Sequence, residues 1–233
     1  MPLHREDVIR TAVELLDEVG LDRLTTRALT TRLGVQPGAL YWHVRSKQEL
    51  LTAIADEIMA EAFAEPAADA VDPDTVGADA DADADWVTRT TAFAHRTRNA
   101  MLAHRDGARV VAGHLSMGTG TLEAAEQGLA LMRAAGVPLP RAAYFGDTIT
   151  SYVTGFVLQE QATAPAPSGP LPEIEPTRFP HLAQWQATKP ATRDAAFATG
   201  LSLIIRGLQA SIVGAASYRD EPVHIAGSAA LDT

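Results

Sequence analysis

Residues 26–47 read TRALTTRLGVQPGALYWHVRSK. Gly34 lies in the middle of this stretch, where a tight turn needs the positive φ that glycine adopts without strain. Pro37 follows three residues later and suits the first turn of a helix, because its missing N–H would have no partner there. The stretch therefore predicts one helix, a turn at Gly34 and a second short helix over residues 36–43, which together form a helix-turn-helix.

Two further helices flank this motif. Apolar residues recur every three or four positions over residues 6–19, as on one face of an amphipathic helix. Ser46 is a good N-cap for a longer helix over residues 47–63. We therefore expect residues 1–47 to form a small three-helix DNA-binding domain and residues 48–63 to form a helix that leads out of it.

The distribution of charge agrees with a DNA-binding role for this domain. The whole chain carries a formal net charge of −10, which by itself argues against binding to phosphates. Residues 23–47, however, contain five basic residues and no acid, whereas residues 64–85 contain eight acids and no base. The surface expected to face DNA is therefore locally cationic, and the acidity lies elsewhere in the chain.

The rest of the chain also reads as helices, so the expected fold class is all-α. Residues 86–216 contain several long segments with helical spacing of apolar residues, and we expect them to form a larger ligand-binding and dimerisation domain. Residues 64–85 alternate alanine and aspartate, which is typical of a mobile, solvated linker, with an electrostatic gate or DNA mimic as the alternative. Residues 162–190 are proline-rich and predict a loop with one helical turn near residues 181–186, and the tail over residues 217–233 is expected to be loose.

Several other classes of protein are disfavoured. The chain has no cysteine, which excludes a disulfide framework and a thiolate metal site. Its first 20 residues are too acidic for a signal peptide and no apolar run approaches 18 residues, so we expect a cytoplasmic protein without a membrane segment. No glycine-rich phosphate loop, nucleophile elbow or metalloprotease motif occurs, and the sequence therefore predicts no catalytic residue, no cofactor and no metal.

The segment His104-Arg105-Asp106 matches the start of a kinase catalytic loop. Gly107 follows the aspartate, however, and Val111 stands where that loop needs asparagine, so we reject the kinase interpretation. A structural hydrogen bond at a helix junction is the preferred role for His104, and a ligand contact is the alternative.

Longer motifs identify a family. Residues 40–51 read LYWHVRSKQELL, and they follow LTTR at residues 24–27 and LGV at residues 33–35. Together these residues resemble the DNA-binding domain of the TetR family, in particular its tetracycline-repressor branch, and the resemblance resumes at residues 104–108, 155–158 and 200–208. It implies a repressor that binds a palindromic double-stranded DNA operator as a homodimer and is released by a small molecule. The alternative is an α-helical enzyme or small-molecule-binding protein with an incidental helix-turn-helix.

The motif and the resemblance together predict the DNA contacts. The start of the second helix should face base edges, and Lys47 should reach phosphate. By resemblance, Arg27 would bind guanine through its planar fork. The tetracycline repressor has Gln-Pro-Thr where this chain has Pro37-Gly38-Ala39, so we expect a different operator. The predicted contacts are Thr26, Arg27, Gln36, Pro37, Gly38, Ala39, Tyr41, Trp42, His43 and Lys47.

The resemblance also implies a ligand pocket among the C-terminal helices. The positions that hold magnesium and tetracycline in that repressor match Phe63, Phe93, Thr97, Val111 and Gln159, and none keeps the repressor's residue. Because an imidazole ligand and a supporting carboxylate are gone, we expect a largely hydrophobic effector and not a magnesium-tetracycline chelate. The expected polar anchors are Thr97, His114, Tyr152 and Gln159. The other expected lining residues are Trp86, Met101, Met117, Met132 and Trp185, although for any one large side chain plain core packing is the preferred interpretation.

Two long helices, over residues 139–161 and 192–216, resemble the pair that forms a four-helix bundle with a second copy of the chain. A small residue allows close approach of two helices, and a row of branched apolar residues supplies buried surface. The predicted dimer interface consists of Gly155, Leu201, Ile204, Ile205, Leu208 and Ile212.

Overall fold

The computed structural model describes residues 3–63, 82–114, 116, 118–162, 174–188 and 192–214. Within these ranges every regular element is a helix and no strand occurs, which confirms the all-α fold. The elements are α1 (Arg5–Val19), the 3-10 turn η1 (Leu21–Arg23), α2 (Thr26–Leu33), α3 (Pro37–Tyr41), α4 (Lys47–Phe63), α5 (Ala82–Ala103), α6 (Gly107–His114), α7 (Thr119–Ala134), α8 (Leu139–Gln161), α9 (Pro180–Ala187) and α10 (Arg193–Gly214).

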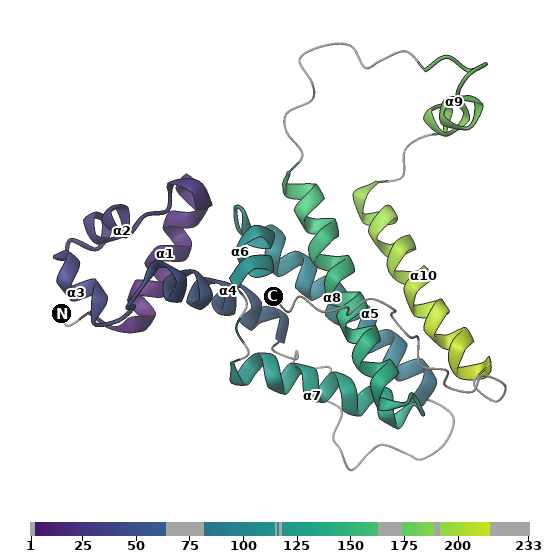
Figure 1. Ribbon diagram of the computed structural model, residues 1–233, viewed down its shortest axis with the longest axis horizontal. Coiled ribbons are helices and arrows are strands. Elements are labelled where there is room, and N and C mark those ends of the chain that lie inside the picture. The colour runs from purple at the N-terminus through teal and green to yellow at the C-terminus, as the bar shows by residue number, and fades with distance from the viewer. Residues whose placement is uncertain are drawn as a thin grey trace, which may run out of the picture.

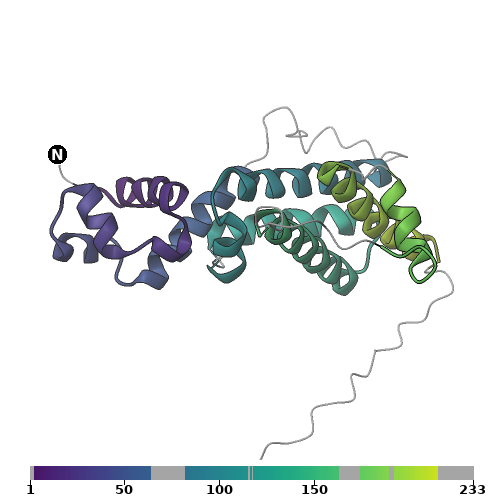
Figure 2. The ribbon, with the colours of Figure 1, turned by 90° about the horizontal axis from the view of Figure 1, so that it is seen from above.

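The helices form two parts that α4 joins (Figure 1). α1, α2 and α3 gather at the N-terminal end, and α4 runs from them into a body made by α5, α6, α7, α8 and α10. The view from above shows the same separation along the long axis of the molecule (Figure 2). Because α4 packs against α1 as well as against α5 and α6, it contacts both parts directly.

Side-chain caps and one glycine set the ends of α2 and α4. Thr25 Oγ1 accepts a hydrogen bond from the N–H of Ala28 at 3.1 Å. Gly34 ends α2 in the left-handed conformation with φ of 67°, as predicted. Ser46 Oγ accepts from the N–H of Glu49 at 3.0 Å, and α4 begins where the sequence predicted. Each cap satisfies a backbone donor that the first turn of a helix leaves without an intrahelical partner.

The recognition helix α3 is shorter than the predicted segment of residues 36–43. Gln36 is its N-cap, Pro37 opens its first turn and Tyr41 ends it. The predicted length was wrong, because the chain leaves α3 in a turn after Tyr41: the N–H groups of His43 and Val44 both donate to the Leu40 carbonyl, at 2.9 and 3.0 Å.

The helix α5 begins at Ala82, four residues before its predicted start at Trp86, so the last four residues of the predicted linker are helical. Alanine has the highest helix propensity, and aspartates in a first turn interact favourably with the positive end of the helix dipole. These local preferences extend the helix into the acidic repeat. The rest of the predicted linker, residues 64–81, and the predicted loose tail over residues 217–233 lie outside the described residues.

One continuous apolar core extends through α4 into the body. It includes Leu16 and Leu29 from the DNA-binding domain, Ile54 from α4, and Trp86 and Phe197 from the body, all of them 0% exposed. Close-packed protein interiors transmit displacements because they contain few voids to absorb them. A shift of α4 would therefore be felt in both parts.

Between α8 and α10 the described residues form one helix, α9, with eight residues from Pro180 to Ala187, where the sequence predicted a single turn near residues 181–186. It lies beyond the ends of α8 and α10, away from the body (Figure 1). Among the described residues, no helix is both long enough and apolar enough to cross a membrane.

Candidate DNA-binding and effector sites

The predicted recognition segment presents one large aromatic side chain to solvent. Trp42, directly after α3, is 89% exposed. So much exposed aromatic surface is unusual on a soluble protein and is typical of a partner contact. Around it, Gln36, Pro37, Gly38 and Tyr41 are exposed, and Ala39 and His43 are half-buried.

Two of the predicted DNA-contacting cations are available for a partner. Arg27 in the first turn of α2 and Lys47 at the start of α4 are exposed, and neither has an ion pair within the described residues. Arg32, in contrast, donates from both terminal nitrogens to Glu18 of α1 at 2.6 and 2.7 Å. The basic stretch therefore divides into cations that hold the domain together and cations that face outward. Thr26 is half-buried at the start of α2.

Five of the predicted ligand residues are buried in the core: Trp86, Thr97, Met101, Val111 and Met132. Trp86 Nε1 and Thr97 Oγ1 are buried and lack a hydrogen-bond partner in the described part of the chain. A buried polar atom left in this state costs about 1–3 kcal/mol. Both atoms lie on α5, and a polar group supplied from outside the chain would remove that cost.

Three more predicted ligand residues contribute aromatic contacts. Phe63 of α4 and Phe93 of α5 stack with ring centroids 6.4 Å apart and planes 9° apart. Tyr152 of α8 stacks on Phe197 of α10 and donates its hydroxyl hydrogen to the Phe197 carbonyl at 2.8 Å. Burial raises the pKa of the Tyr152 hydroxyl.

The remaining predicted ligand residues do not join this group. His114 Nδ1 lies 2.9 Å from Gln48 Nε2 on α4, so its side chain already has a partner. Gln159 is exposed, and Trp185 on α9 is 70% exposed. Met117 lies outside the described residues. A separate groove of about 350 Å³ opens between α5 and α10, and none of the twelve predicted ligand residues lines it.

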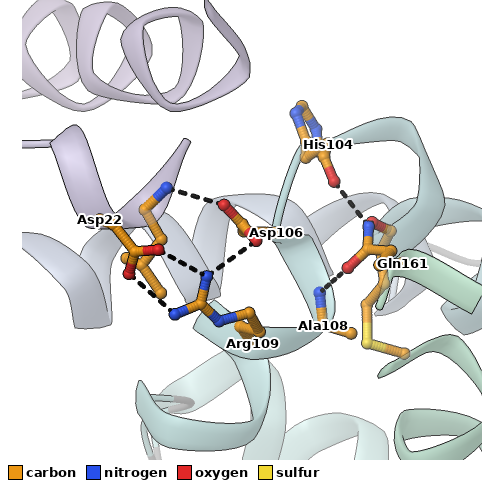
Figure 3. Close-up of polar contacts among 8 residues, drawn as sticks. Asp22, His104, Asp106, Ala108, Arg109 and Gln161 are labelled. Carbon is orange, nitrogen blue, oxygen red and sulfur yellow. Dashed lines mark hydrogen bonds and ion pairs between the residues drawn. The ribbon is translucent and has the colours of Figure 1, made fainter. Parts of the chain in front are cut away.

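A polar cluster that the sequence did not predict joins the DNA-binding domain to α6 (Figure 3). Arg109 donates to Asp22 at 2.9 Å and to Asp106 at 3.0 Å, and Asp106 in turn accepts from the backbone N–H of Leu21 at 2.8 Å. Asp106 has a φ of 58°, a conformation that is costly for a residue with a Cβ. The cluster holds it there, because both of its carboxylate oxygens are bonded.

Gln161 at the end of α8 fixes the corner between α5 and α6 (Figure 3). Its Nε2 donates to the carbonyls of Met101 and His104 at 2.9 and 2.8 Å, and its Oε1 accepts from the N–H of Ala108 at 3.0 Å. The same corner reaches the DNA-binding domain, since His104 Nδ1 lies 3.0 Å from a carboxylate oxygen of Asp17 on α1. The expected structural role of His104 at a helix junction is confirmed.

A buried ion network ties α5 to α8 and α10. The Arg98 side chain is only 7% exposed and pairs with Glu160, itself 9% exposed, and with Asp194 at 2.7 and 2.8 Å. The Arg98 guanidinium also lies over the Phe197 ring, 4.9 Å from its centroid. These charges hold the pKa of Arg98 above its ordinary value, the hydrogen bond to Glu160 being the main cause. The sequence predicted none of these contacts, because the three charged residues are far apart along the chain.

Three of the six predicted dimer-interface residues are buried within the chain itself. Leu201, Ile205 and Leu208 are 1%, 4% and 7% exposed, because they face the chain's own core and not solvent. Gly155 and Ile204 are half-buried, and the side chain of Ile212 lies outside the described residues. The close helix approach expected at small residues occurs within the chain: a Cβ at Gly200 would lie 2.3 Å from the Tyr152 hydroxyl oxygen.

Known proteins match the chain over both of its parts. Residues 8–54 match the family described as bacterial regulatory proteins, tetR family, and residues 79–212 match the tetracyclin repressor-like C-terminal domain. The class A tetracycline repressor protein from transposon 1721 of Escherichia coli is 38% identical over 208 residues, which are 88% of this chain and 90% of that protein.

Two solved structures are similar to this chain over nearly its whole length. The TetR family protein ActR of Streptomyces coelicolor, in complex with actinorhodin, is 28% identical with a TM-score of 0.75, over 91% of this chain and 99% of that one. Mycobacterium smegmatis BioQ, with its natural double-stranded DNA operator, is 31% identical with a TM-score of 0.61, over 89% of this chain and 99% of that one. The chain therefore belongs to the TetR family of bacterial regulatory proteins and is a ligand-responsive transcriptional repressor.

Proposed function

We propose that the protein binds a palindromic operator as a homodimer, reads it with α3 and the start of α2, and is released by a largely hydrophobic effector. The observation that carries the DNA part is the exposed Trp42 beside two cations without ion pairs, Arg27 and Lys47. An aromatic ring and two free cations on one small helical domain match the sugar-phosphate and base edges of DNA.

Fluorescence anisotropy with a labelled duplex from the region next to its own gene tests this function. Specific operators are typically bound about 10³- to 10⁷-fold more tightly than random DNA, and affinity falls with salt as phosphate contacts release counterions. Equal affinity for the neighbouring duplex and for random DNA of the same length would contradict sequence-specific repression by this chain at that place.

The proposal of a hydrophobic effector rests on the chemistry of the interior. Phe63, Phe93, Thr97 and Val111 place rings, a hydroxyl and an aliphatic side chain where a metal chelate needs carboxylate oxygens or imidazole. Thr97 Oγ1 and Trp86 Nε1 are the buried polar atoms that an effector would satisfy. The bound effector would favour a conformation in which the two DNA-binding domains of the dimer, its reading heads, no longer fit successive major grooves. Shifting the protein from 99:1 in favour of the DNA-binding conformation to 99:1 in favour of the released one needs about 5.5 kcal/mol of differential effector affinity for the two conformations.

Isothermal calorimetry with tetracycline, with and without magnesium, is expected to show no metal-dependent binding at micromolar concentration. An apolar aromatic compound that binds equally well with and without magnesium, and that also releases the operator duplex, would match the proposed pocket. Sub-micromolar binding of tetracycline that disappears when magnesium is chelated would contradict it.

The proposed dimer surface is the outer face of α8 and α10, opposite the residues that fill the core. Leu203 on α10 and Tyr144 on α8 are 67% and 71% exposed, and they supply apolar surface that a second copy of the chain would cover. Two copies joined here would carry reading heads that must lie about 34–36 Å apart to reach successive major grooves.

Leu203→Arg is expected to convert the dimer into a monomer at micromolar concentration, because an unpaired cation buried in an interface costs several kcal/mol. Light scattering coupled to size exclusion measures the mass. Leu122→Arg on α7 is the matched control, since Leu122 is also exposed, at 50%, and lies outside this face. An unchanged dimer mass for Leu203→Arg would show that Leu203 lies outside the dimer interface.

A further inference from the structure

Arg109 binds one carboxylate from each side of the domain junction. Its Nη2 donates to Asp22 Oδ1 at 2.9 Å, and its Nη1 donates to Asp106 Oδ1 at 3.0 Å. Asp22 belongs to η1 in the DNA-binding domain, whereas Asp106 and Arg109 belong to the corner that begins α6. Of the cations in the described residues, Arg109 is the one that hydrogen-bonds to Asp22. The Asp22 side chain is 80% exposed, so its charge is felt by whatever approaches this surface.

Asp22 lies in the same small domain as the residues proposed to contact DNA, because η1 (Leu21–Arg23) leads into α2, whose first turn holds Arg27. The pKa of the Asp22 carboxyl is held below its ordinary value mainly by the hydrogen bonds and charge of Arg109, with a smaller contribution from the charge of Lys47. Lys47 is exposed and has no ion pair within the described residues. An exposed carboxylate in this domain repels DNA phosphates unless a cation such as Arg109 neutralises it.

We propose that Arg109 neutralises Asp22 while α6 is docked on the DNA-binding domain, and that Asp22 lowers the affinity for DNA once Arg109 is displaced. This inference rests on the proposed function. The uncovered carboxylate repels DNA phosphates. DNA affinity then depends on the position of α6 through charge, in addition to any change in the spacing of the two reading heads.

A purely mechanical role for the same contacts predicts a different order of DNA affinities among the variants. If the pair only clamps the two domains together, removing either partner breaks the clamp, and removing both does no better. If charge is what matters, the balance at the pair decides the affinity: zero in the wild type, −1 in Arg109→Gln, +1 in Asp22→Asn, and zero again in the double variant. The double variant therefore separates the two roles.

Anisotropy titrations of the full-length protein with a duplex that the wild type binds give the test. At about 50 mM salt we expect Arg109→Gln to bind the duplex about 3- to 10-fold more weakly than the wild type. Asp22→Asn should bind it as tightly as the wild type or more tightly. The affinity of the double variant should return to within about twofold of the wild type. At about 1 M salt the Debye length falls to about 3 Å, and the differences should largely disappear. Arg109→Lys keeps the charge and should stay close to the wild type.

Matched controls change the same charges far from the junction. Arg133→Gln and Glu126→Gln alter exposed residues of α7 and should leave DNA affinity unchanged. Circular-dichroism melting curves show that each variant is folded, which is expected because the Asp22–Arg109 pair is largely exposed.

A double variant as weak as Arg109→Gln, or an Asp22→Asn protein weaker than the wild type, would overturn the electrostatic role and leave a mechanical clamp. A wild-type protein that binds no DNA would overturn the proposed function and this inference together. These two failures are distinguishable, because the first is observed only with a wild-type protein that binds the duplex.

Discussion

Arg98→Met is expected to lower the free energy of unfolding by about 3–5 kcal/mol, the usual loss when one partner of a buried ion pair is removed. Methionine keeps much of the volume of the side chain but leaves Glu160, which is 9% exposed, without its cation. Urea unfolding followed by circular dichroism, at one fixed protein concentration, measures the change. The pKa of Arg98 lies above its already high ordinary value, so Arg98 keeps its charge in neutral and alkaline buffers, and the loss of stability should not depend on the titration of Arg98 there.

Two companions sharpen this prediction. Arg133→Met removes an exposed arginine of α7 and should change the free energy of unfolding by no more than about 0.5 kcal/mol. Arg98→Met combined with Glu160→Met replaces the pair by apolar side chains and should recover most of the loss, since such replacements are often neutral. A loss below about 1 kcal/mol for Arg98→Met alone would show that the network is solvated and adds little to stability.

Arg27→Ala is expected to reduce the preference for the operator over random DNA by about 1–3 kcal/mol, the usual contribution of a bidentate contact to guanine. Lys47→Ala should instead weaken binding to all sequences alike and reduce the salt dependence by about one phosphate contact. Anisotropy titrations with operator and random duplexes at several salt concentrations separate the two effects.

Arg32→Ala is the matched control for Arg27→Ala, because both residues lie on α2. Arg32 is engaged with Glu18 at 2.6 and 2.7 Å and is not free to bind DNA, so its removal should leave specificity unchanged. If Arg27→Ala weakened operator and random DNA equally, as Lys47→Ala is expected to do, Arg27 would not be reading bases, and the proposed orientation of the helix-turn-helix on DNA would be wrong.

The predicted DNA contacts and the predicted pocket residues differ in how well the sequence alone could identify them. The DNA-facing residues were predicted from a short continuous motif, and the structure leaves Trp42, Arg27 and Lys47 exposed there. The pocket residues come from several helices, and the structure divides them between the buried core, with Thr97 and Trp86, and the surface, with Gln159 and Trp185. A contiguous motif keeps its members together in any fold, whereas a pocket depends on how helices pack.

The sequence by itself determined where most helices begin and end. Gly34 stops α2, Pro37 opens α3, Ser46 caps α4, and α8 runs from Leu139 to Gln161 as predicted. Caps, prolines and glycines act on backbone groups within about four residues, so their effect is readable without knowing the fold.

Only the tertiary structure decided which face of each helix meets which neighbour. The apolar stripe of α10 reads equally well as a dimer surface or as core, and packing on the rest of the chain assigns Leu201 and Ile205 to the core. Likewise, Asp22 and Arg109 look like two unrelated surface charges until folding brings residues 87 positions apart within 2.9 Å. Periodicity shows that a helix has an apolar side, but which partner covers that side depends on contacts between segments distant in the chain, and no local pattern records them.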